Sequence, residues 1–176
     1  MRRLALLVLL AAVLVALPKL LGTTVLPPEV SDLLGIDGAD RERARVVRVT
    51  DGDTLRVRLS DGREENVRVL GIDTPEDHDP VECGGPEATA AMATLAPVGS
   101  TVLLVSDPTQ GDRDRYDRLL RYVERKDRDV GKALVASGHA QVFVFHDDPF
   151  RRTDAYRKVE KRSERLDAGL WASCWR

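Results

Sequence analysis

The sequence predicts an α+β domain: a small five-stranded Greek-key barrel of the OB type, joined by about three helices. Three observations support this fold class. Short segments in which apolar and polar residues alternate follow one another from residue 45 onward, as expected of half-buried strands. The pair Asp61-Gly62 between two such segments is a strong hairpin signal. Segments with helical spacing separate the later strands, and five short strands with interleaved helices favour a small closed barrel.

Alternation identifies the predicted strands. Val47 and Val49 share one face of the first strand, and Leu55, Val57 and Leu59 share one face of the second. The remaining three strands are predicted in the segments "ENVRVLGI", "STVLLVSD" and "RLLRYVER". The end of "ENVRVLGI" is apolar at consecutive positions, so we expect this part of the strand to be buried on both faces.

Three helices are predicted from their start and stop signals. Pro86 suits the first turn of a helix that follows two glycines, and an apolar stripe continues from it. Asp129 caps a second, short helix that stops at Gly138. The last helix is expected at about residues 151–168, because apolar residues recur there at helical spacing and Gly169 ends the pattern.

Composition bounds the function only loosely. The chain of 176 residues is 43% hydrophobic and 32% charged, which suits one folded domain with extra segments. Its formal net charge is −2, so no basic excess marks it as a nucleic-acid binder. Its two cysteines, Cys83 and Cys174, are too few for a disulfide-scaffold protein but sufficient for one bridge.

The N-terminus differs from the rest of the chain. Arg2 and Arg3 precede an unbroken apolar run over residues 4–17, which has the length of a signal-peptide core. A good cleavage motif is missing, so a cleaved signal peptide and a retained membrane anchor both remain open. Either way, we expect the rest to be exported, and to be secreted or held at the outer face of the cytoplasmic membrane. We therefore divide the chain into a signal peptide or anchor at residues 1–26, a linker at 27–44 and a folded domain at 45–176.

The segment "DGDT" at residues 51–54 poses the first chemical question. Asp53 has the same parity as the apolar residues Leu55 and Val57, so its carboxylate is expected at the barrel mouth, pointing inward. An inward carboxylate is costly unless it is paired or binds a metal. The alternative is a turn residue whose carboxylate caps backbone N–H groups.

The segment "GIDTPED" at residues 71–77 offers two more carboxylates. Asp73 and Glu76 follow the buried third strand, where they would be placed to act chemically. The structural alternative is a helix start, with Thr74 as the N-cap and Pro75 in the first turn.

Two arginines complete the set. Arg68 lies within the third strand and Arg118 ends the charged loop "DRDRYDR", and each alone would be an ordinary solvated residue. Together with the carboxylates, they offer oxygen ligands for a hard cation such as Ca²⁺, an arginine clamp for a phosphate and a carboxylate to handle water. That combination suits phosphodiester hydrolysis.

The order of these motifs resembles the staphylococcal-nuclease-like (thermonuclease) family. "DGDT", an arginine in the next strand, "DTPE" and an arginine after "RY" follow the family's order and spacing, and the resemblance covers about residues 44–172. It implies an OB-fold barrel with three helices, and Ca²⁺-dependent cleavage of DNA and RNA that leaves 3′-phosphate ends. It also implies that Glu76 activates or orients the attacking water. By position, it assigns metal binding to Asp53, Asp73 and the carbonyl of Thr74, catalysis to Arg68, Glu76 and Arg118, and substrate contacts to Arg115 and Tyr116.

Some features depart from the family pattern. Asp117 stands where the family's best-known member has glycine, and the segment "VFVFHDD" offers phenylalanines where tyrosines are expected near a base. That member also lacks the two cysteines. We predict that Cys83 and Cys174 form a disulfide, because export places them in an oxidising compartment and the bridge would hold the C-terminal tail. Two unrelated buried thiols are the alternative.

The sequence therefore predicts an exported, Ca²⁺-dependent endonuclease that acts on DNA and RNA. We expect a monomer, with a membrane contact only if the N-terminal segment is retained. The alternative is a catalytically silent OB-fold module that binds nucleic acid or a protein. Such modules use aromatic stacking surfaces, and only 5% of this chain is aromatic.

Overall fold

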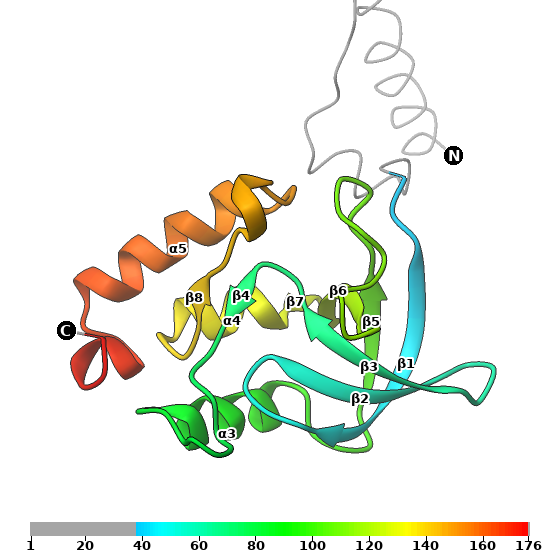
Figure 1. Ribbon diagram of the computed structural model, residues 1–176, viewed down its shortest axis with the longest axis horizontal. Helices are drawn as coiled ribbons and strands as arrows, with labels where there is room; N and C mark the ends of the chain where they lie inside the picture. The colour runs from blue at the N-terminus through cyan, green and yellow to red at the C-terminus, as the bar shows by residue number, and fades with distance from the viewer. Residues whose placement is uncertain (1–37, 176) are drawn as a thin grey trace, which may run out of the picture. The chain divides into compact units, whose positions relative to one another are not determined.

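A ring of five strands closes because β3 pairs with β2 on one side and with β6 on the other (Figure 1). In ring order the strands are β3 (Glu64–Val69), β2 (Thr54–Leu59), β1 (Arg41–Val49), β5 (Thr101–Val105) and β6 (Leu119–Arg125). Neighbours are antiparallel except β3 and β6, whose parallel pairing closes the ring. The predicted five-stranded barrel is confirmed.

The computed structural model describes residues 38–175, and the folded unit begins at Ala39. The predicted signal peptide or anchor, and most of the predicted linker, lie outside the described residues. β1 begins at Arg41, inside the segment predicted as linker. None of the helices formed by the described residues combines the length and the apolar character that a membrane span requires.

Short elements extend the barrel and cover it. β7 (Arg128–Asp129) pairs with β6, while β4 (Ile72–Asp73) and β8 (Gln141–Val142) form a separate two-stranded sheet. Among residues 38–175, the helices are α3 (Gly85–Leu95), α4 (Val130–Ala136) and α5 (Thr153–Arg165), with two 3₁₀ turns, η2 (Phe145–Asp147) and η3 (Gly169–Ala172). α5 packs against α4 and β8, so it lies beside the two-stranded sheet (Figure 1).

β1 contains a bulge that the alternation pattern did not predict. Val46 faces the core, and the pairing with β2 then shifts between Val46 and Arg48. Val47 is the extra residue, Arg48 is turned outward, and Val49 stands opposite the buried Leu55. The prediction that Val47 and Val49 share one face is therefore wrong.

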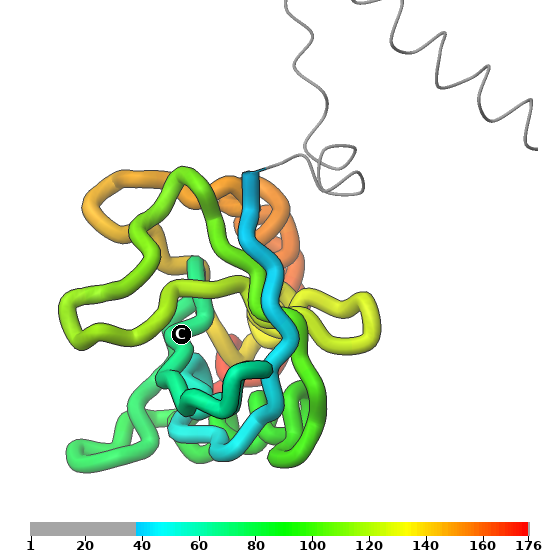
Figure 2. Tube along the Cα trace, turned by 90° about the vertical axis from the view of Figure 1, so that its right-hand side faces the viewer, coloured from blue at the N-terminus to red at the C-terminus, as the bar shows by residue number. Residues whose placement is uncertain are grey.

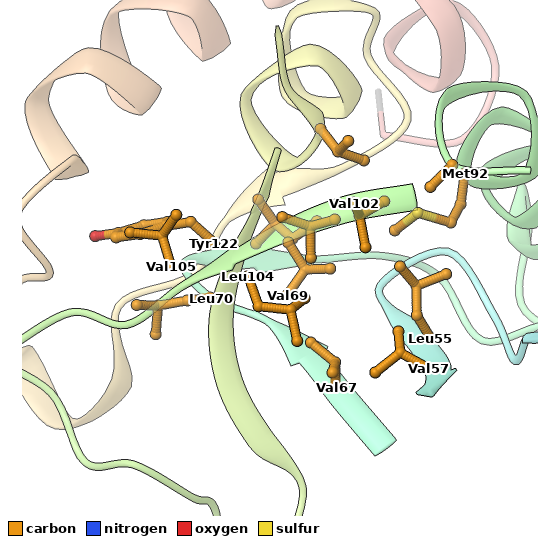
Figure 3. Packing of buried hydrophobic residues seen from close by; sticks show 14 of the residues in the cluster. Leu55, Val57, Val67, Val69, Leu70, Met92, Val102, Leu104, Val105 and Tyr122 are labelled. Atoms are coloured by element: carbon orange, nitrogen blue, oxygen red, sulfur yellow. The ribbon is translucent and has the colours of Figure 1, made fainter. Parts of the chain in front are cut away.

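The barrel interior is filled by branched apolar side chains (Figure 3). Leu55 and Val57 of β2 are fully buried, as predicted, together with Val67 and Val69 of β3. Met92 of α3 packs into the same cluster. Burying one such side chain contributes about 1.5–3 kcal/mol. The core therefore fixes the strand register on which the site depends.

The third predicted strand is interrupted before its end. β3 stops at Val69, and the chain turns at Leu70 and Gly71 before β4 begins at Ile72. Gly71 has a φ of 79°, and a Cβ there would lie 2.4 Å from the ring of Phe150, so only glycine fits. All four residues from Val69 to Ile72 are buried, as predicted.

The helix predictions are confirmed with one correction. α3 begins at Gly85, and α5 spans the centre of the predicted last helix. The Asp129 carboxylate caps α4 by accepting a hydrogen bond of 2.9 Å from Lys132 N. No helix begins at Thr74: residues 74–77 form neither helix nor strand, because tertiary contacts of this segment replace the local cap. The capping alternative for this segment is therefore wrong.

A disulfide joins Cys83 to Cys174, as predicted, with Cα atoms 5.7 Å apart. It connects the segment before α3 to the end of the chain beyond η3. Gly84 lies beside it, where a Cβ would be 2.5 Å from the Leu170 side chain. A bridge between residues 91 positions apart contributes about 4–5 kcal/mol in the chain-entropy model.

Asp107 is a buried carboxylate outside the predicted site. Its Oδ2 accepts hydrogen bonds from Tyr122 OH at 2.5 Å and Arg151 N at 2.8 Å, and its Oδ1 accepts one from Thr109 N at 2.9 Å. Burial works against ionisation, but these hydrogen bonds outweigh it and hold the pKa of Asp107 below its ordinary value. The ionised carboxylate therefore ties β6 to the segment before α5.

We predict that Asp107→Asn lowers the free energy of unfolding at pH 7 by about 1.5–3 kcal/mol, since the amide lacks the charge that strengthens these hydrogen bonds. A carboxyl with a lowered pKa contributes stability above the pKa of the unfolded chain, and loses it as pH falls through the folded value. The stabilities of the two proteins, measured by denaturant unfolding, should therefore differ at pH 7 and converge as pH falls through the lowered pKa of Asp107. A difference that stays constant over this range would contradict the assignment.

Candidate active site

The "DGDT" turn uses its two aspartates differently. The Asp51 carboxylate accepts a hydrogen bond of 3.0 Å from Asp53 N, which closes the turn between β1 and β2. Gly52 lies so close to neighbouring segments that a Cβ would be 2.6 Å from Thr74 Oγ1 and 2.8 Å from Ala88 Cβ. The turn interpretation therefore holds for Asp51, and Asp53 is left for another role.

The Asp53 carboxylate is buried and held from several sides. It lies just before β2, as predicted, and its side chain is 9% exposed. Oδ1 accepts a hydrogen bond from Thr54 Oγ1 at 3.0 Å, and Oδ2 accepts from Thr74 N at 3.2 Å and Thr74 Oγ1 at 3.3 Å. Arg68 Nη1 lies 3.0 Å from Oδ2. One charged group and three neutral donors therefore fix the carboxylate.

Arg68 spans the two acidic positions. The β2–β3 register sets it directly opposite Thr54, and its side chain is only 14% exposed. Nη1 also donates to Ile72 O at 2.7 Å, and Nη2 donates to Asp73 Oδ1 at 2.8 Å. A single guanidinium therefore positions Asp53 and β4 together, while the Asp73 side chain remains 58% exposed.

Arg118 reaches the same group of residues from another strand. It directly precedes β6, and the parallel pairing of β3 with β6 brings the start of β6 beside Arg68. Arg118 Nη1 donates to Thr54 Oγ1 at 3.3 Å, and its Nε donates to Asp114 Oδ2 at 2.7 Å. The Thr54 hydroxyl thus accepts from Arg118 and donates to Asp53.

The loop before Arg118 carries the predicted substrate residues. Arg115 Nη2 donates to Tyr116 OH at 2.6 Å, and the guanidinium groups of Arg115 and Arg118 lie 4.7 and 5.4 Å from the Tyr116 ring centre. The tyrosine is 64% exposed, so its ring is open to a ligand. Asp117 has a φ of 64°, so this position keeps the left-handed turn for which glycine is best suited.

Glu76 is held through its backbone. Glu76 N donates to Glu82 Oε2 at 3.0 Å, and Glu82 N donates to Glu76 O at 2.8 Å. Gly85 packs against the same carbonyl, where a Cβ would lie 2.1 Å from Glu76 O. The Glu76 side chain is exposed, and its carboxylate forms no hydrogen bond or ion pair within residues 38–175. It is therefore available to a ligand.

Burial dominates the electrostatics of Asp53. It raises the pKa of this carboxyl to about 7, although the Arg68 guanidinium works in the opposite direction. The negative charge of Asp51 adds to the upward shift. Because burial destabilises the charged form, further positive charge near Asp53 would favour its ionisation at neutral pH.

The donor atoms suit a hard cation. The carboxylates of Asp53 and Asp73 and the carbonyl of Thr74 are oxygen ligands of the kind that Ca²⁺ takes. Arg68 contacts only one oxygen of Asp73, which leaves the other for a ligand. Among residues 38–175, no group of three or more His, Cys, Asp or Glu side chains is arranged to hold a metal ion. The Thr74 carbonyl and water would therefore have to complete the shell of an ion bound by the two carboxylates.

Five of the predicted site residues thus lie in one hydrogen-bonded group, with the Thr54 hydroxyl as its link: Asp53, Arg68, Asp73, Thr74 and Arg118. Glu76 and Arg115 do not contact this group through their side chains in the described part of the chain. Three residues of the site were not predicted from the sequence: Thr54, Asp114 and Glu82. Asp114 has a weak signal, an opposite charge four residues before Arg118, whereas no pattern marks Glu82.

Comparison with known proteins relates this geometry to a family. The family model described as staphylococcal nuclease homologue matches residues 66–173, which include Arg68, Asp73 and Arg118 but not Asp53. Thermonuclease of Staphylococcus hyicus is 29% identical over 142 residues, which cover 79% of this chain and 81% of that protein. Endonuclease YncB of Bacillus subtilis is 30% identical over 126 residues, covering 71% of this chain and 59% of that protein. The SPbeta prophage-derived endonuclease YokF of the same species is 31% identical over 126 residues, covering 71% and 42%.

Proposed function

This chain belongs to the staphylococcal nuclease homologues, and from that premise we propose that it is a Ca²⁺-dependent endonuclease. It would hydrolyse phosphodiester bonds in DNA and RNA and leave 3′-phosphate ends. The observation that carries the proposal is one hydrogen-bonded group, in which Arg68 contacts the carboxylates of Asp53 and Asp73 directly. Arg118 is joined to Asp53 through the Thr54 hydroxyl.

Arg68 and Arg118 are suited to stabilise negative charge on a phosphate. Each is fixed by acidic partners, Asp53 and Asp73 for the first and Asp114 for the second. Within residues 38–175, Nε of Arg68 and Nη2 of Arg118 donate to no other group, so both remain for a substrate. Because the arginines are held before substrate arrives, little reorganisation is needed as charge develops on the phosphate oxygens.

Glu76 is suited to accept or direct the proton of the attacking water. Its exposed carboxylate is unpaired in the described part of the chain, and Glu82 holds its backbone in place. Calcium, bound by Asp53 and Asp73 with the Thr74 carbonyl, would supply positive charge for a phosphate oxygen. The oxygen-only donor set supports this part of the proposal.

A catalytically silent OB-fold module is the second candidate. The exposed rings of Tyr116, Phe143 and Phe145 would suit a module that stacks on bases. A binding module has no need, however, of a buried carboxylate whose ionisation is opposed by its surroundings. Asp53 therefore favours the enzyme.

We also propose that the protein acts outside the cytoplasm. The disulfide between Cys83 and Cys174 supports this, because such bridges form and persist in oxidising compartments.

We predict that the purified protein cleaves DNA and RNA with Ca²⁺, loses activity in a chelator and regains it when Ca²⁺ is returned. Mg²⁺ should restore little, because it demands a tight octahedral shell and keeps its waters. The products should resist extension by a polymerase until a phosphatase removes the 3′-phosphate. Full activity in chelator would refute the metal requirement, and directly extendable products would refute the 3′-phosphate ends.

Arg118→Lys should lower kcat by about 10²–10³-fold, because lysine lacks the planar fork that meets phosphate oxygens. Arg121→Lys is the matched control. Arg121 lies in β6 and pairs with Asp112 at 2.5 Å, but its hydrogen bonds do not reach Thr54 or Asp53. This control should change kcat less than about threefold. A near-normal rate for Arg118→Lys would leave Arg118 with a structural role in its loop.

A further inference from the structure

β1 and β2 carry two rows of arginines on the outer face of the barrel. Each row is a directly opposed pair, Arg48 with Arg56 and Arg45 with Arg58, and all four residues are exposed. We call these four residues the arginine rows. β1 lies on the side of the barrel that faces the viewer in Figure 2. None of these four arginines belongs to the site described above.

The arginine rows continue the candidate active site along the same face of the sheet. Thr54, Arg56 and Arg58 alternate along β2, so their side chains point to one side. Thr54 stands opposite Arg68 in the site. Alternate residues of a strand are about 6.6–6.8 Å apart, so the first row begins about that distance from Thr54 and the second row follows at the same spacing.

The bulge in β1 creates the row nearest the site. Regular alternation from the buried Val46 would turn residue 48 toward the core. The extra residue, Val47, turns Arg48 outward instead and sets it opposite Arg56. Bulges commonly re-aim a side chain, and here the result is a like-charged pair that a regular strand would not form.

This arrangement is unfavourable for the isolated fold. Like charges that stand directly opposite each other in an antiparallel pair repel. Glu64 offsets part of the repulsion, because its carboxylate accepts hydrogen bonds from Arg56 Nε at 2.9 Å and Arg58 Nη2 at 2.6 Å. Arg45 and Arg48 form no ion pair within residues 38–175. Two guanidinium groups are therefore left without a counter-charge.

We propose that the arginine rows bind phosphates of a nucleic-acid strand that extends beyond the bond being cleaved. The proposal rests on the proposed nuclease function and adds to it a second contact surface for phosphates along the substrate strand. The rows lie beside the arginines that would hold the reacting phosphate, and their charge complements a phosphate chain. The chain's net charge of −2 conceals this local positive region.

The test measures binding without cleavage. A fluorescently labelled DNA strand of about 20 nucleotides is titrated with the full chain in chelator, between about 50 and 200 mM salt. Arg45→Gln/Arg48→Gln should weaken binding about tenfold or more at the lower salt and reduce the slope of log K against log salt by about 1.4, since two phosphate contacts are lost. The same variant should melt about 1–3 °C higher, because repulsion is relieved.

α5 offers a matched control for net charge. Arg157 and Lys161 are exposed, one helical turn apart, and without an ion pair in the described part of the chain. Arg157→Gln/Lys161→Gln removes the same charge away from the rows and should weaken binding less than about twofold. Arg45→Lys/Arg48→Lys keeps the charge of the rows and should retain most of the affinity.

Three outcomes would overturn the proposal. If both glutamine double variants lost the same DNA affinity, the rows would act only through the net charge of the protein. If Arg45→Gln/Arg48→Gln lost no affinity, the rows would be an ordinary solvent-exposed surface. If Arg45→Gln/Arg48→Gln bound DNA normally but no longer bound vesicles of anionic lipid, this face would be a membrane contact. Since cleavage is not measured, a failure to find nuclease activity would count against the proposed function alone.

Discussion

The buried ion pair between Asp53 and Arg68 is the interaction on which the site depends. The β1–β2 turn supplies the carboxylate and the β2–β3 register supplies the guanidinium, so the pair forms only when the barrel does. The same guanidinium holds the Ile72 carbonyl and the Asp73 side chain, which fixes β4. Breaking a buried pair by removing one partner costs about 3–5 kcal/mol. The same ion pair therefore stabilises the fold and positions the residues of the candidate site.

Closure of the barrel adds a second arginine to the ion pair of Asp53 and Arg68. The parallel pairing of β3 with β6 brings Arg118 to the Thr54 hydroxyl, and through it to Asp53. Two features are then unfavourable for folding alone: a carboxyl whose pKa burial raises, and opposed arginines on the outer face of β1 and β2. The arginines lie where a phosphate chain would supply negative charge, and Asp53 lies where a bound cation would supply positive charge. Natural proteins commonly give up stability in this way at functional sites.

Local pattern predicted much of this structure, and long-range contacts account for what it missed. The alternation in β2 correctly predicted that Asp53 does not face solvent, because parity along a regular strand fixes the direction of a side chain. The bulge at Val47 was missed, since alternation assumes that no extra residue is present. The local sequence around Arg68 predicted a solvent-exposed side chain. Its burial was missed because the residues that cover it belong to β4 and to the turn before β2. The backbone clamp of Glu82 on Glu76 is a contact between loop residues, and no periodicity reports it.

The two aspartates of the turn are expected to differ in role: Asp53 binds Ca²⁺, whereas Asp51 stabilises the turn through its hydrogen bond with Asp53 N. Calorimetric titration of the full chain with Ca²⁺, comparing Asp53→Asn with Asp51→Asn, tests it most directly. An asparagine at position 51 keeps the acceptor oxygen for Asp53 N, so this variant should bind Ca²⁺ within about threefold of the parent, whereas Asp53→Asn should weaken binding at least about tenfold. Thermal unfolding of both variants establishes that they are folded. Normal Ca²⁺ binding by Asp53→Asn, or an equal loss in both variants, would contradict the account.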